Sequence, residues 1–99
     1  MSARTPEGKL KERCRGLCKR LGLFWANVEG KGFNGFPDTV VGKYPAGSGL
    51  IMLEAKRAGK EPTEQQYKRI AEIREAGGEA DWCDTFEGFC EKIGYDPDL

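Results

Sequence analysis

The sequence predicts an α/β fold in which helices flank a short mixed β-sheet, in the order α-β-β-β-α-β-α. Segments with apolar residues at helical spacing alternate with short apolar runs typical of strands, and turn residues separate them. This alternation favours helices on both faces of one sheet. A length of 99 residues suits a single domain, residues 1–99, with a small core.

The first helix is predicted to begin after Thr5, with Pro6 at its first position and Gly22 beyond its end. Its apolar stripe recurs at helical spacing: Leu10, Cys14, Leu17, Cys18 and Leu21. Glu7 shares this inward face. An acidic residue in a first turn is also favoured by the helix dipole, and position alone favours that explanation.

Three strands are predicted next, at residues 23–28, 38–41 and 50–56. A glycine-rich loop with Lys31 follows the first; it could lie along a phosphate backbone or be a plain connection. Residues 45–49 form a turn, so the second and third strands should pair as an antiparallel hairpin. The third strand is apolar on both faces until its carboxyl end, which indicates a central place in the sheet.

A second helix is predicted to follow Thr63 and to end at Gly77-Gly78. Gln66 lies three residues after Thr63, as in a capping box. Its side chain could return to the Thr63 amide or point toward the end of the third strand, and spacing leaves both open. Residues 80–83 predict the fourth strand, and Asp84 or Thr85 caps the last helix.

The charges are unevenly distributed, although the formal net charge is zero. Residues 1–20 hold seven basic and two acidic side chains, whereas residues 61–99 hold four and eleven. A basic N-terminal segment can bind a polyanion. The solvated face of a helix would carry such charges as well, so this signal alone decides nothing.

Cysteine spacing and the absence of histidine argue against zinc. Cys14, Cys18, Cys83 and Cys90 are expected to be buried free thiols. The polar start and the lack of a long apolar run predict a cytoplasmic protein with no membrane partner.

Asp38, Glu54 and Lys56 are the strongest functional signal. Each lies at the edge of a predicted strand, and Glu54 and Lys56 share one strand face. Two carboxylates and a lysine at neighbouring strand ends can form a divalent-metal site with a charged helper. Such a site is a common means of phosphodiester hydrolysis.

The chain resembles a stand-alone VRR-NUC domain of the PD-(D/E)XK nuclease superfamily, of the kind common in bacteriophages. The resemblance implies a restriction-endonuclease-like core. Five elements, in the family's order and over most of the chain, carry it: Thr5-Pro6-Glu7-Gly8-Lys9, Gly35-Phe36-Pro37-Asp38, Leu53-Glu54-Ala55-Lys56, Lys60-Glu61-Pro62-Thr63-Glu64-Gln65-Gln66 and Ala76-Gly77-Gly78.

By this resemblance Asp38, Glu54 and the backbone carbonyl of Ala55 bind Mg²⁺, with Mn²⁺ as a substitute. Lys56 would assist the attacking water or the phosphate. The resemblance adds Glu7 and Gln66 to the catalytic residues.

The implied activity is that of a DNA endonuclease selective for structure, such as Holliday junctions or flaps, rather than for sequence. Basic residues would hold the DNA backbone: Lys9, Arg13, Lys31, Arg57 and Lys60. Paired cuts would need a homodimer, and a phage-encoded chain would act in the host cytoplasm. The alternative is a non-catalytic nucleic-acid-binding module, a subunit of a larger replication or repair complex.

Overall fold

The computed structural model describes residues 5–29 and 32–99, and it confirms the predicted order of elements. In chain order these are α1 (Pro6–Leu21), β1 (Trp25–Asn27), β2 (Thr39–Gly42), β3 (Leu50–Ala55), α2 (Glu64–Glu75), β4 (Ala80–Cys83) and α3 (Phe86–Ile93). No helix within these described ranges is long and apolar enough to span a membrane.

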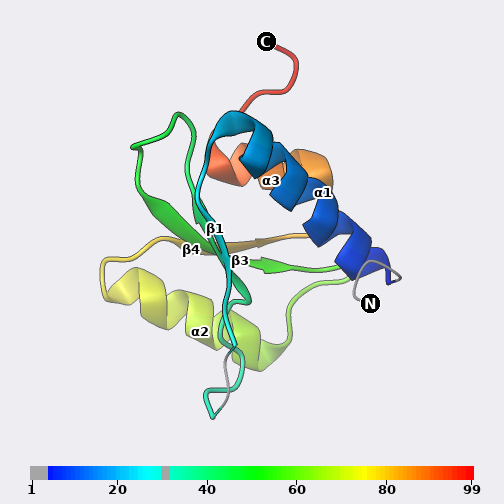
Figure 1. Ribbon diagram of the computed structural model, residues 1–99. Helices are drawn as coiled ribbons and strands as arrows, with labels where there is room; N and C mark the ends of the chain where they lie inside the picture. The colour runs from blue at the N-terminus through cyan, green and yellow to red at the C-terminus, as the bar shows by residue number, and fades with distance from the viewer. Residues whose placement is uncertain (1–4, 30–31) are drawn as a thin grey trace.

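The strands form one mixed sheet in the order β1-β2-β3-β4. β2 pairs antiparallel with both β1 and β3, whereas β3 and β4 are parallel and α2 connects them. The predicted hairpin and the central place of the third strand are therefore confirmed. Figure 1 shows α1 and α3 on one face of the sheet and α2 on the other.

The main core lies between the sheet and the pair α1 and α3. It contains large side chains with almost no exposure: Leu17, Val41, Leu53, Phe89 and Ile93. All four cysteines are free and buried within it, as predicted. Burial raises the pKa of Cys18 to about 11 and that of Cys83 to about 12, which keeps these thiols protonated and unreactive at neutral pH.

Short polar side chains fix the helix starts. Thr5 Oγ1 accepts a hydrogen bond from the Gly8 amide, and Thr85 Oγ1 accepts one from the Gly88 amide. Thr85 is therefore the cap of α3. The carboxylate of Asp84, the other candidate, instead accepts from the Gly59 amide at 3.0 Å.

The first strand is shorter than the predicted range 23–28. Leu23 instead takes part in the cap that closes α1, because its amide donates to the Cys18 carbonyl at 2.8 Å. β2 begins one residue later than predicted and β3 ends one residue earlier. Lys56 nevertheless continues the pairing with β4, since its amide donates to the Cys83 carbonyl.

Residues 33–35 of the glycine-rich loop contact α2. The Asn34 carbonyl accepts from Arg69 Nε at 2.8 Å, and the Arg69 guanidinium lies 3.9 Å from the centre of the Phe33 ring. Gly35 has a φ of 83°, and a Cβ there would lie 2.7 Å from the Gln65 carbonyl oxygen. This close approach positions the chain three residues before Asp38.

We expect Gly35→Ala to destabilise the fold more than Gly47→Ala does. Both positions have positive φ, which costs about 1–2 kcal/mol for alanine. Only at Gly35 does the new methyl group also meet the backbone of α2. Urea unfolding of the two variants would measure the difference, and equal losses would show that the loop does not pack against α2.

Candidate active site

Strand register brings the two predicted acidic residues together. Thr39 pairs with Leu53 across β2 and β3, which places Asp38 beside Glu54 at the next position along the strands. Glu54 is only 5 % exposed and Lys56 only 9 %. Charged side chains this deeply buried normally have partners, so their contacts are informative.

Glu54 is held by a neutral donor and a more distant cation. Its Oε2 accepts a hydrogen bond from Gln66 Nε2 at 3.2 Å, and Lys56 Nζ lies 3.8 Å from the same oxygen. Burial raises the pKa of Glu54 to about 7, with a smaller contribution from the Asp38 carboxylate, and the nearby ammonium groups of Lys56 and Lys11 oppose this rise. The carboxyl group therefore titrates near neutrality.

Gln66 makes both contacts that its spacing allowed. Its side-chain Oε1 accepts a hydrogen bond from the Thr63 backbone amide at 2.9 Å. The backbone amide of Gln66 donates to Thr63 Oγ1 at 3.2 Å, which completes the capping box. The oxygen is thus engaged at the helix start, and the amide nitrogen is directed at Glu54. The start of α2 and the orientation of the Glu54 carboxylate depend on the same side chain.

Asp38 is paired with a residue that the sequence reasoning missed. Lys11 Nζ forms an ion pair with Asp38 Oδ2. The available signal was helical phase, because Lys11 lies four residues after Glu7 and shares its face. The other oxygen, Asp38 Oδ1, is buried and has no hydrogen-bond partner.

Glu7 lies close enough to Glu54 for its charge to contribute to the raised pKa of that carboxyl group. It is half-buried in the first turn of α1. Within residues 5–29 and 32–99, however, no three His, Cys, Asp or Glu side chains gather as a ligand set. Glu7 therefore lies near the acidic pair.

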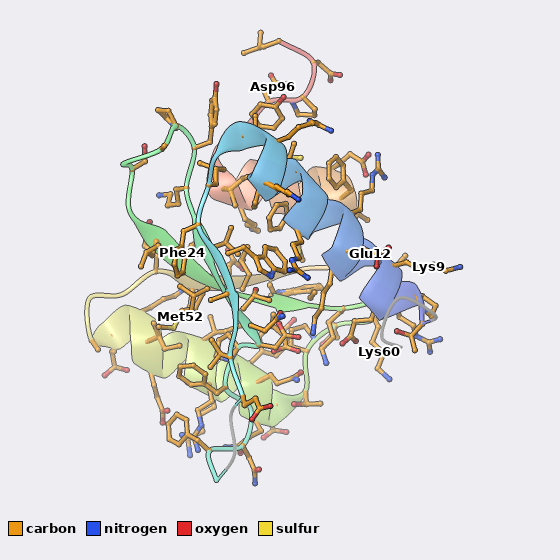
Figure 2. All side chains as sticks on the ribbon, in the orientation of Figure 1. Lys9, Glu12, Phe24, Met52, Lys60 and Asp96 are labelled. Carbon is orange, nitrogen blue, oxygen red and sulfur yellow. The ribbon has the colours of Figure 1, made fainter. Side chains whose placement is uncertain are left out.

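The predicted DNA-contacting residues have different environments. Lys9, Arg57 and Lys60 are exposed, and Figure 2 shows Lys9 and Lys60 at the side of the molecule where α1 begins. The Arg13 guanidinium lies 3.9 Å from the centre of the Phe86 ring, on the side of α1 that faces α3. Lys31 is outside the described residues.

The residues at this site suit a hard cation. The donors are the carboxylates of Asp38 and Glu54, with the carbonyl of Ala55 adjacent in the chain, and oxygen donors are those that Mg²⁺ prefers. The buried, unpartnered Oδ1 of Asp38 is a free acceptor of the kind that a cation would satisfy. Two carboxylates leave room for water ligands, which Mg²⁺ usually retains.

The fold is that of solved VRR_NUC domains. One structure described as a VRR_NUC domain superposes with a TM-score of 0.76 and 21 % identity, covering 91 % of this chain and 96 % of its own. A second, described as a VRR_NUC domain protein, gives 0.73 and 15 %, covering 91 % and 86 %. No family model matches the sequence, and no curated protein does. At these identities the likeness establishes the fold.

The raised pKa of Glu54 predicts a pH-dependent stability. Without metal, the folded protein holds a proton near pH 7 that the unfolded chain releases near its ordinary pKa of 4.5. The free energy of unfolding should therefore fall as the pH rises from about 4.5 to about 7, by up to about 3 kcal/mol. Urea unfolding in EDTA should show this decline in the wild type and lose it in Glu54→Gln; identical pH profiles would contradict the assignment.

The dual contact of Gln66 can be separated with a matched pair of variants. Gln66→Ala and Thr63→Ala both break the capping box, which costs about 1 kcal/mol. Only Gln66→Ala also removes the donor to Glu54. We expect metal affinity, measured by calorimetric titration with Mn²⁺, to fall about 10–100-fold in Gln66→Ala alone. An equal loss in Thr63→Ala would reduce Gln66 to a capping residue.

Proposed function

We propose that this chain belongs to the VRR-NUC family and is a Mg²⁺-dependent DNA endonuclease. The observation that carries the proposal is the pair of half-buried Asp38 and buried Glu54, with the buried Oδ1 of Asp38 left without a hydrogen-bond partner and Lys56 near Glu54. The fold shared with solved VRR_NUC domains supports it.

Asp38, Glu54 and the Ala55 carbonyl would hold the ion, with Mn²⁺ as a substitute. When bound, the ion polarises the phosphate and lowers the pKa of a water molecule. Because Glu54 titrates near neutrality, ion binding requires loss of its proton and should strengthen as the pH rises.

The chain's own side chains prepare the reaction. Lys56 is buried near Glu54, and its ammonium can orient the attacking water or offset the negative charge that builds on the phosphate. Gln66 positions the Glu54 carboxylate from the start of α2. Glu7 adds negative charge close to the pair.

Contacts with phosphates carry no sequence information. We therefore propose selectivity for branched DNA, such as junctions or flaps, over particular sequences. The described residues hold one site of the Asp38 and Glu54 kind, so paired cuts would require a homodimer. A phage-encoded protein of this kind would work in the host cytoplasm.

A non-catalytic DNA-binding subunit is the competing proposal, and the exposed cations of α1 favour it. It does not account for the buried Glu54 carboxylate beside Asp38. Carboxylates beside a phosphate backbone repel it, so a pure binder would gain nothing from Asp38 and Glu54.

The test is cleavage of a panel of junction, flap, nicked and linear DNA with Mg²⁺ or Mn²⁺. We expect Asp38→Asn, Glu54→Gln and Lys56→Met each to lower the cleavage rate at least about 100-fold. The first two remove a carboxylate that would hold the metal ion, and the third removes the ammonium group that would offset negative charge on the phosphate. Glu91→Gln, which changes an exposed acid on α3, is the control and should cleave normally.

Full activity in Glu54→Gln, or cleavage that persists in excess EDTA, would refute the proposed chemistry. Wild-type protein that binds the panel but never cleaves it would favour the binding subunit.

A further inference from the structure

A basic groove runs between α1 and the edge strand β1, which contact each other. Two adjoining hollows of about 90 and 420 Å³ form it, and they share Arg15, Trp25 and Asn27 in their walls. Lys11 lines the first hollow and Lys19 the second. Within the described residues, no other strand pairs with the outer edge of β1.

The cations of the groove form a single row. Lys11, Arg15 and Lys19 follow one another at four-residue spacing, which places them on one side of the helix over about 12 Å. Glu12 is the one acidic residue among those that line the two hollows. The row therefore presents a stripe of excess positive charge along the groove.

The outer two cations are available for a ligand. Arg15 and Lys19 are exposed, and neither pairs with a carboxylate in the described part of the chain. Three cations on the other helices are paired with carboxylates: Arg69 with Glu72, and both Arg74 and Lys92 with Asp81. Unpaired exposed cations in a row are suited to a ligand with regularly spaced negative charges.

The groove leads to the acidic pair. Its inner cation, Lys11, is the residue that contacts Asp38, so the stripe of charge ends at a proposed metal ligand. A chain of phosphates lying on Arg15 and Lys19 would reach Asp38 without a change of direction along α1.

We propose that the α1–β1 groove binds the backbone of one DNA strand and guides it to Asp38. The choice of DNA as the ligand rests on the proposed nuclease function, but the groove residues lie outside the acidic pair. A span of about 12 Å covers a few successive phosphates of one strand. Arg15 and Lys19 are then the main backbone contacts, in place of Arg13, whose guanidinium lies over Phe86.

The test compares two variants with the same loss of charge. Arg15→Gln/Lys19→Gln removes the groove cations, whereas Arg20→Gln/Lys68→Gln removes one arginine and one lysine that do not line it. Fluorescence anisotropy with a labelled single-stranded oligonucleotide and its duplex, in EDTA at several KCl concentrations, gives the salt dependence of binding. All four positions are exposed, and circular dichroism would verify that both variants fold.

The groove variant should bind more weakly on every sequence, and the slope of log K against log salt should fall in magnitude by about 1.4–1.8, the value for two lost phosphate contacts. The control should keep the wild-type slope. Equal changes in both variants would show that only the total charge of the protein matters, which would contradict a specific groove. Unchanged binding of the groove variant, or no DNA binding by the wild type, would also overturn the proposal.

Cleavage separates this proposal from the proposed function. If the wild type never cleaves but the slopes differ as expected, the groove stands and the nuclease assignment fails. If the wild type cleaves with Mg²⁺ and the groove variant has an unchanged KM, the nuclease assignment stands and the groove fails.

Discussion

A buried carboxylate, that of Glu54, is the constraint on which the site and much of the fold depend. An ionised group at this depth is costly unless it is hydrogen-bonded or paired. Here the Gln66 amide supplies the hydrogen bond and Lys56 the opposite charge, while burial still raises the pKa of Glu54 to about 7. Gln66 also completes the capping box of α2, so the start of this helix and the hydrogen bond to the Glu54 carboxylate depend on one side chain.

The opposite face of the sheet contributes through α1. This helix buries Cys14 and Cys18 in the core, and Lys11 near its amino-terminal end reaches Asp38. The side of the helix that carries Lys11 also carries Arg15 and Lys19 along β1. One amphipathic helix thus joins the core, the acidic pair and the basic groove, so the proposed DNA path and the proposed metal ligands are fixed relative to one another.

Periodicity and capping residues predicted most of the fold, because the starts of α1 and α2 depend on local contacts of Thr5 and Thr63. The proximity of Asp38 and Glu54 was predictable from strand ends and a hairpin. Spacing could not choose between the two roles of Gln66, since one amide group makes both contacts. Lys11 was missed because its partner lies 27 residues away, beyond a loop whose path depends on packing against α2.

The central claim is that Asp38 and Glu54 form one cation site together with the Ala55 carbonyl. The most direct measurement is the anomalous scattering of Mn²⁺ in crystals of the protein grown or soaked with that ion. A peak within coordination distance of both carboxylates and the Ala55 oxygen, with Lys11 displaced from Asp38 Oδ2, is the expected result. Mn²⁺ bound elsewhere, or no peak while Lys11 stays on Asp38, would contradict the account.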